Sequence, residues 1–232
     1  MRNPDVDDDA MRDSGTLTDF AYRTLRVDII RGVRPPGERL RIEKLKQIYR
    51  IGPTPIREAL QKLSAERLVM TEGNRGFTVA PLDLEEFRDL NVARTEVELA
   101  ALRRSIAHGG DAWEAAVVAA AYIMKKEDAA LAAPDGCVTD SWERANAAFH
   151  AATVAACGSR WLLHARNSLQ DQCERYRRAS IGSDRGERKL NTEHAEIAEA
   201  VLARDADRAC DLTRGHFQRT ERALVANWSR PS

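Results

Sequence analysis

The sequence predicts a mainly α-helical protein, in which a small N-terminal domain of three helices and a hairpin precedes a larger helical bundle. Apolar residues recur three and four positions apart through most of the 232 residues, which is the spacing of one helix face. The pattern of strands is confined to residues 68–79. Charge is unevenly distributed along the chain. Residues 15–80 contain thirteen basic and seven acidic residues, whereas residues 81–232 contain 21 basic and 24 acidic residues. We therefore expect a basic N-terminal domain followed by a separate helical domain.

The first predicted helix follows an acidic tail. Residues 1–14 lack apolar periodicity and carry five acidic and two basic residues, so we expect them to be disordered. Phe20, Leu25 and Ile29 then fall near helical spacing, with Thr18 as a candidate N-cap. Gly32 marks the end of this helix.

Two further helices are predicted after the proline-glycine turn at residues 35–37. The first is a two-turn helix around residues 42–49, which ends before Gly52. In the next helix Thr54 is the expected N-cap and Pro55 the first helical residue. The buried stripe of this third helix consists of Ile56, Ala59, Leu60 and Leu63.

A hairpin follows the third helix. Residues 68–70 and 77–79 are rich in strand formers and flank a glycine-rich turn that contains Arg75. Three small helices and a hairpin with a basic tip form a winged helix-turn-helix arrangement. In that arrangement the third helix enters the major groove of DNA and the hairpin contacts the backbone or the minor groove. We assign this domain to residues 15–80.

Every segment from residue 83 onward is helical in pattern. Glycine, proline and aspartate residues with turn or cap chemistry separate the segments. Six helices are predicted, at about residues 83–107, 111–132, 139–156, 160–180, 186–203 and 205–228. We expect them to form an all-α antiparallel bundle over residues 83–228.

Composition excludes several classes of protein. Apolar residues make up 43% of the chain, enough for a core, and no run of about 18 apolar residues indicates a membrane span. The acidic start differs from a secretory signal, and the four cysteines form no C-x-x-C pair. We expect a cytoplasmic protein without a membrane association.

Residues 40–82 resemble the DNA-binding domain of the GntR family of bacterial transcription regulators. The run TPIREAL at residues 54–60 carries most of this likeness, and the hairpin turn NRGF at residues 74–77 supports it. The resemblance implies binding to double-stranded operator DNA, and the candidate DNA-contacting residues are Arg41, Lys46, Arg50, Thr54, Arg57 and Arg75. For Arg57 an ion pair with Glu43 or Glu58 is the structural alternative.

The sequence departs from the family just before the recognition helix. Family members commonly carry glycine-valine-serine-arginine there, whereas this chain has Arg50, Ile51, Gly52 and Pro53. The serine and arginine that often approach DNA are missing, and Lys46 and Arg50 supply positive charge nearby.

The second domain resembles the helical effector domain of the FadR branch of this family, often called FCD. Six helices are typical of its shorter, VanR-like variant. The residues that carry the likeness are Arg94, Glu98, Asn146, His150, His194 and His216.

The resemblance implies a divalent metal, zinc with nickel or manganese as alternatives, held by Asn146, His150, His194 and His216. It also implies that Arg94 holds the carboxylate of a small organic acid, whereas an Arg94–Glu98 ion pair is the structural alternative. Asn146 replaces the usual aspartate, which removes one negative charge.

The sequence as a whole is interpreted as a homodimeric, ligand-responsive transcription regulator, and repression is its default mode within the family. We expect no enzyme activity, because no general base stands at a recognisable spacing from the histidines and an enzyme has no need of a basic winged domain. A constitutive DNA-binding regulator with a purely structural metal, or with none, is the remaining alternative.

Overall fold

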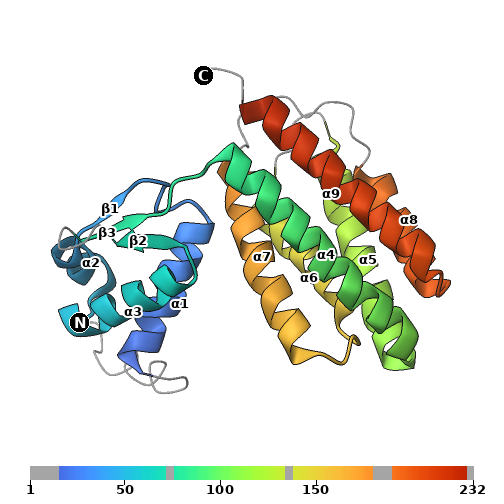
Figure 1. The fold of residues 1–232 in the computed structure, drawn as a ribbon, viewed down its shortest axis with the longest axis horizontal. Coiled ribbons are helices and arrows are strands. Elements are labelled where there is room, and N and C mark those ends of the chain that lie inside the picture. Colours follow the sequence, from blue (N-terminus) through green and yellow to red (C-terminus); the bar gives the residue numbers. More distant parts are fainter. Residues whose placement is uncertain (1–15, 72–75, 134–137, 180–189, 229–232) are drawn as a thin grey trace, which may run out of the picture. The chain divides into compact units, whose positions relative to one another are not determined.

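The computed structural model describes residues 16–71, 76–133, 138–179 and 190–228. It divides the chain into two compact units, Met1–Leu82 and Asp83–Ser232 (Figure 1). Helices dominate both units, which confirms the predicted fold class. The tail at residues 1–14 and the hairpin tip with Arg75 lie outside the described residues.

The N-terminal unit combines three helices with a small sheet (Figure 1). Its elements are α1 (Leu17–Ile30), β1 (Arg39–Leu40), α2 (Ile42–Tyr49), α3 (Pro53–Ala65), β2 (Val69–Thr71) and β3 (Phe77–Val79). The predicted stripe of α3 is buried against α1 and α2. Because that stripe faces inward, the opposite face of α3 is left for solvent or a partner.

The start of α1 differs from the prediction. Thr16, not Thr18, is the N-cap, and it forms a capping box with Asp19. The Thr18 hydroxyl instead donates to Glu58 Oε2 at 2.7 Å. A threonine three residues before a carboxylate satisfies two orphan helix donors at once, and this favours Thr16 as the cap.

The start of α3 also differs. Gly52, with extended backbone at φ −62° and ψ 163°, is the N-cap, and the helix begins at Pro53. Thr54 therefore lies inside the first turn and does not cap the helix. Pro53 accounts for the earlier start, because proline presets a helical φ and its missing N–H has no partner at the first helical position.

The sheet has three strands in the order β1-β3-β2, whereas the sequence predicted only the β2–β3 hairpin. β1 pairs antiparallel with β3, and Arg39 lies opposite Thr78. Two residues are too few to show an alternating pattern, so β1 had no detectable sequence signal.

The C-terminal unit contains six helices within its described residues, as predicted. They are α4 (Leu84–His108), α5 (Asp111–Leu131), α6 (Asp140–Val154), α7 (Arg160–Ala179), α8 (Leu190–Leu202) and α9 (Ala206–Trp228). α4 packs against α6, α7 and α9, while α5 packs against α6 and α8 (Figure 1).

The helical unit has an apolar core and also buries many polar or charged side chains. Leu102, Val117, Phe149 and Val201 belong to the core. The buried polar or charged side chains that line the interior of the unit include Arg94, Glu98, Glu143, Asn146, His150, Arg166, Gln170, Arg177, His194 and His216. Buried polar groups of this kind need partners, so their arrangement marks the part of the bundle that can hold a ligand.

Among the described residues, none of the helices has both the length and the apolar character needed to span a bilayer.

Candidate DNA-contacting surface and candidate metal centre

The N-terminal unit carries an open groove between α2, α3 and the sheet. Arg41 and Arg57 both line it, together with Arg39, Gln61 and Thr71. Arg41 is the N-cap residue of α2 but makes no side-chain capping bond, and its side chain is exposed. Two guanidinium groups are thus exposed along one face, where they can contact phosphates or base edges.

Arg57 does not form the ion pair that was its structural alternative. Glu43 binds Lys46 at 2.9 Å, and Glu58 accepts from Thr18. Within the described ranges no carboxylate pairs with Arg57, which is exposed on the second turn of α3. The guanidinium therefore remains available to an external partner.

Three other candidate DNA-contacting residues, Lys46, Arg50 and Thr54, are not among the residues that line this groove. Lys46 lies in the last turn of α2, and Arg50 ends that helix in the left-handed conformation at φ 55°. Thr54 is exposed in the first turn of α3. The structure thus brings Arg41 and Arg57 together at one groove. Thr54 lies at the start of α3, and Lys46 and Arg50 lie at the end of α2.

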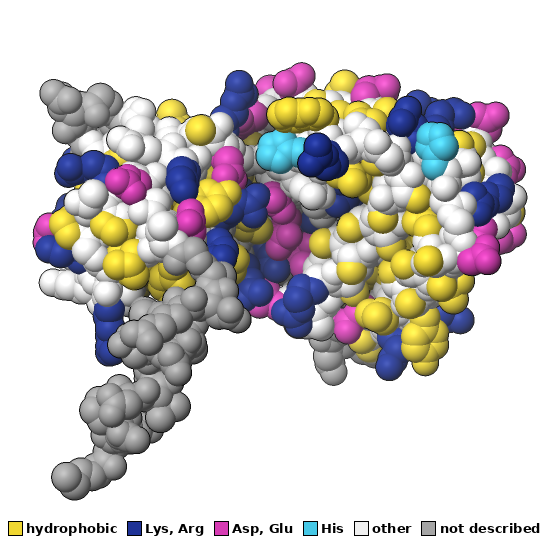
Figure 2. Space-filling view, turned by 90° about the horizontal axis from the view of Figure 1, so that it is seen from below, with side chains coloured by type: hydrophobic (Ala, Val, Ile, Leu, Met, Phe, Trp, Pro, Cys, Tyr) yellow, Lys and Arg dark blue, Asp and Glu magenta, His cyan; other side chains and the backbone are white. Residues whose placement is uncertain are grey.

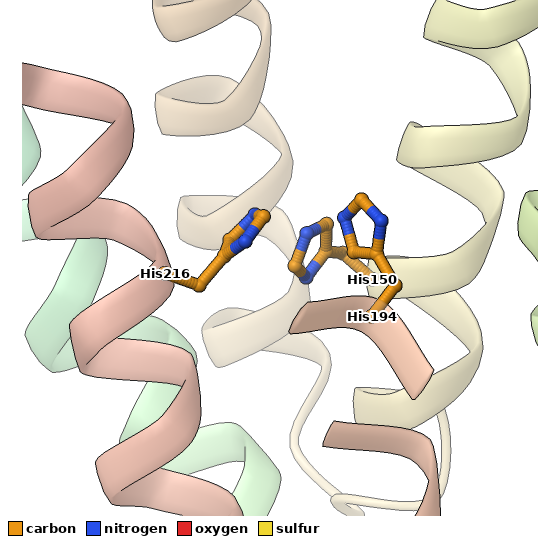
Figure 3. A group of neighbouring side chains, drawn as sticks. All are labelled: His150, His194 and His216. Carbon is orange, nitrogen blue, oxygen red and sulfur yellow. The ribbon is translucent and has the colours of Figure 1, made fainter. Parts of the chain in front are cut away.

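Three histidines from three helices meet inside the C-terminal unit. His150 comes from α6, His194 from α8 and His216 from α9, and their rings point toward one another (Figure 3). One nitrogen from each lies within 4.8 Å of the others, and all three side chains are buried. Imidazoles gathered this way are typical ligands of divalent transition metals.

Two carboxylates orient two of the imidazoles. Asp128 Oδ2 lies 2.6 Å from His194 Nδ1, and Glu193 Oε2 lies 2.8 Å from His216 Nδ1. A carboxylate at Nδ1 holds the proton there and leaves Nε2 as the lone-pair donor. Nε2 of each of these two imidazoles then carries the lone pair that can bind a metal ion.

Two ring nitrogens of this histidine centre lack hydrogen-bond partners among the described residues. Nε2 of His150 and Nε2 of His194 are buried and form no hydrogen bond in the part of the chain that the structure describes. Burial, with the nearby His216 and Arg94, holds the pKa of His150 well below its usual value, so this imidazole is neutral. A neutral imidazole with a free lone pair fits a metal ion, and the residues present are therefore consistent with one.

Asn146 lies one helical turn before His150 on α6 and is 3% exposed. Residues four apart share one face of a helix, so the amide belongs to the same side of α6 as the imidazole. Its oxygen is a neutral ligand atom where a carboxylate would carry a charge.

Arg94 on α4 is buried without a carboxylate. Its guanidinium carbon lies 4.0 Å from the centre of the Phe217 ring, and its Nε is unpartnered among the described residues. Burial lowers the pKa of Arg94, the direction expected of a cation without a paired anion. The proposed alternative pair is not formed, because Glu98 binds Arg166 through two bonds of 3.0 and 3.3 Å.

Several residues of this interior had not been predicted from the sequence. Asp128 and Glu193, which hold the imidazoles, belong to this group, and so do Phe217 and Gln170. Glu193 precedes His194 directly, a weak signal, whereas Asp128 lies on α5, far from any histidine in the sequence. Helix packing alone brings it to the site.

Two family profiles match the chain. The profile described as bacterial regulatory proteins of the gntR family matches residues 17–79, and the FCD domain profile matches residues 89–219. Together they cover most of both structural units.

Two bacterial proteins are similar to most of the chain. The chain is 41% identical over 207 residues to the HTH-type transcriptional repressor GlaR of Escherichia coli K12, covering 87% of this chain and 93% of GlaR. It is 37% identical over 203 residues to the HTH-type transcriptional regulator BphR of Paraburkholderia xenovorans LB400, covering 88% of this chain and 83% of BphR. These relatives are transcription regulators and not enzymes.

Solved structures share the fold. A GntR regulator from Rhodococcus sp. RHA1 aligns with a TM-score of 0.71 at 24% identity, covering 90% of this chain and 97% of that one. The E. coli protein McbR/YncC aligns with a TM-score of 0.78 at 18% identity, covering 93% of this chain and all of that one. From the two profiles and the relatives, the chain belongs to the GntR family of bacterial transcription regulators and combines its DNA-binding domain with an FCD domain.

Proposed function

We propose that this DNA-binding regulator is a homodimeric repressor whose helical domain binds a small organic acid at a metal centre. The observation that carries the proposal is the meeting of three buried imidazoles, two of them with unpartnered Nε2 atoms, beside a buried arginine that lacks a carboxylate. Buried polar and charged groups without partners lower the stability of the empty protein, and a bound cation and anion would remove that cost.

The metal ligands in this proposal are His150, His194 and His216, with Asn146 as a fourth, neutral ligand. Zinc suits this nitrogen-rich set, and nickel or manganese are alternatives. When bound, the ion would supply open coordination positions for an oxygen ligand. Asp128 and Glu193 keep their imidazoles in the orientation that binding needs.

Arg94 is proposed to hold the carboxylate of the effector. A guanidinium matches a carboxylate with two parallel hydrogen bonds, and burial strengthens such a pair. Because Glu98 is engaged by Arg166, no described side chain competes for Arg94 as its anion. An effector carboxylate would therefore remove the cost of an unpaired buried charge.

The DNA-contacting surface is proposed to be the exposed face of α3 together with the groove that Arg41 and Arg57 line. Arg57 is suited to a bidentate contact with guanine, and Arg41 to a phosphate. Lys46, Arg50 and Thr54 are proposed to add contacts to the DNA backbone, and Arg75 is proposed as a further contact. A regulator of this kind acts on the chromosome in the cytoplasm.

Dimer formation is proposed to use the outer face of α5. Val118, Tyr122 and Ile123 are exposed there by 53%, 65% and 53%, and no charged residue lies between Glu114 and Lys125. In a two-fold dimer the same patch faces itself, so an uncharged apolar patch meets its copy without like-charge repulsion. Figure 2 shows that hydrophobic side chains also gather on the surface of the helical unit.

Repression is proposed because GlaR, which is similar over most of both chains, is named as a repressor. Two winged domains held by one dimer would bind a pseudo-palindromic operator. The effector would release the operator to the extent that it binds the DNA-free arrangement more tightly than the DNA-bound one.

Metal content and ligand-induced stabilisation test the proposal together. We expect purified protein to retain about one zinc ion per chain, and His150→Ala combined with His194→Ala to lose it. His108→Ala, an exposed histidine of α4, is the matched control and should keep the metal.

A thermal-shift screen of hydroxy-, keto- and dicarboxylic acids then asks whether the site binds an effector. An acid that binds the folded protein must raise the midpoint, and removal of the metal by a chelator should abolish the shift. Stabilisation by metal alone, with no response to any acid, would instead favour a constitutive regulator with a structural ion.

A further inference from the structure

Gln170 on α7 has a buried side chain. It is 3% exposed, and neither its Oε1 nor its Nε2 has a partner in the described part of the chain. Buried polar atoms in native proteins are nearly always hydrogen-bonded, so an amide with both ends unpartnered indicates a missing partner.

The register of α4 and α7 places Gln170 beside the proposed effector site. Arg166 of α7 binds Glu98 of α4 at 3.0 Å, and the ring of Tyr176 lies 4.8 Å from that of Phe87. The two helices are therefore antiparallel, and interpolation between these contacts places Gln170 opposite the turn of α4 that carries Arg94.

Electrostatic neighbours lead to the same placement. Arg94 lies within electrostatic range of Arg166, Cys173 and Arg177, the residues of α7 on either side of Gln170. Arg166 and Arg94 both also influence His150, so the arginines, the histidine centre and this face of α7 surround one interior region.

Two of the arginines near Gln170 are bound to carboxylates. Arg166 donates to Glu98, and Arg177 donates to Glu143 at 3.2 and 2.9 Å. Among the described residues, the amide of Gln170 therefore has no hydrogen-bond partner, and it lies opposite the turn of α4 that carries Arg94.

The chemistry of an amide specifies what can fill this position. Its NH₂ donates and its oxygen accepts, so a complete partner must accept and donate at the same point. A carboxylate only accepts and would leave Oε1 unpartnered, whereas a hydroxyl group does both. We propose that Gln170 recognises a hydroxyl group of the effector, which makes the effector a hydroxycarboxylate whose carboxylate Arg94 holds. This inference rests on the proposed effector site and adds its specificity.

Calorimetric titration with matched acids tests the proposal. The probes are lactate against propionate, malate against succinate, and 2-hydroxyglutarate against glutarate, with both enantiomers of each hydroxy acid. In at least one pair the wild type should bind one hydroxy acid about tenfold or more tightly than its deoxy counterpart. Gln170→Met, which keeps the length but removes both polar atoms, should reduce that preference to about twofold or less while the deoxy acid binds as before.

The matched control is Gln218→Met, the same change at an exposed glutamine of α9, and it should retain the preference. Equal affinity of the wild type for both members of every pair that binds, or a preference that survives Gln170→Met, overturns the role of Gln170. If the wild type binds none of these acids, while other carboxylates bind at the metal, the hydroxyl assignment alone fails. If no carboxylate binds, the effector site itself fails.

The stability of the ligand-free protein is an independent readout. An unpartnered amide destabilises the empty protein, so Gln170→Met should raise its thermal midpoint, and Gln170→Leu should do the same. A lower midpoint for both variants would mean that the amide already has a partner in the empty protein, and would overturn the proposal.

Discussion

Asp128→Asn is the substitution that most sharply separates a metal centre from a cluster of structural histidines. Asp128 is 2% exposed and lies between two donors. Its Oδ2 lies 2.6 Å from His194 Nδ1, and its Oδ1 accepts from Trp142 Nε1 at 3.0 Å. Asparagine has a single acceptor oxygen. If that oxygen keeps the bond from Trp142, the NH₂ group faces His194 Nδ1, and the imidazole must then accept there and carry its proton on Nε2 as an unsatisfied donor.

The magnitude follows from these two contacts. Loss of a carboxylate that orients a ligating imidazole typically lowers metal affinity about 10- to 100-fold. The unsatisfied donor should also lower the free energy of unfolding of the metal-free protein by about 1 to 3 kcal/mol. The first effect exists only if Nε2 of His194 binds a metal, whereas the second arises from burial alone.

Competition with a chromophoric chelator measures zinc affinity, and urea unfolding of the metal-free protein measures stability. Glu127→Gln is the matched control, because Glu127 is the preceding residue of α5 and accepts from Ser141 rather than from a histidine. The control should leave zinc affinity unchanged. If Asp128→Asn lowers stability but leaves zinc affinity intact, His194 is not a ligand and the proposed centre is wrong.

Further predictions concern the DNA surface, the helix cap, the dimer face and the effector arginine. Arg57→Ala should weaken operator binding by about 1 to 3 kcal/mol in anisotropy titrations, and unchanged affinity would show that α3 is misplaced. Thr16→Ala should lower the free energy of unfolding by about 0.5 to 2 kcal/mol in urea, because it removes the capping box of α1. Tyr122→Glu should shift the mass measured by light scattering from dimer to monomer, since it places two carboxylates opposite each other, and a persistent dimer would exclude the α5 face. Arg94→Gln should weaken acid binding by about 1.5 to 3 kcal/mol in calorimetry and should raise the stability of the ligand-free protein. A variant that loses both acid binding and stability would mean that Arg94 has a structural role.

The helices were largely predictable because their signals are local. Gly109 and Gly110 separate α4 from α5, and the apolar spacing of Ile56, Ala59 and Leu63 defines the buried face of α3. Periodicity and turn chemistry need only neighbouring residues, so one sequence is sufficient.

Element ends and very short strands were less predictable. Thr16 and Thr18 are both acceptable N-caps by composition, and only the reciprocal bond with Asp19 distinguishes them. Pro53 and Pro55 are both acceptable at the start of α3, and the extended backbone of Gly52 decides between them. β1 forms because residues 39–40 pair with the edge of β3, a contact that depends on the tertiary fold and not on the local sequence.

The candidate site was predictable only in part. The likeness to a known family indicated His150, His194 and His216, and the structure brings these three together. Asp128 and Gln170 are ordinary polar residues in the sequence, and only the packing of α5 and α7 moves them to the interior. The pairing of Arg94 was likewise undecidable, because Glu98 is one turn away in the sequence yet binds Arg166 from another helix.

Operator binding in the presence of acid and metal distinguishes a metal-assembled sensor from a constitutive regulator. A fluorescent duplex selected by the protein from a random DNA pool would be titrated with zinc-loaded protein, with metal-free protein and with the His150→Ala, His194→Ala double variant, each with and without the acid that gives the largest thermal shift. We predict that all three proteins bind the duplex and that the acid weakens binding only for the zinc-loaded wild type. An acid response that is equal with and without metal, or absent from all three proteins, would contradict a metal-assembled sensor.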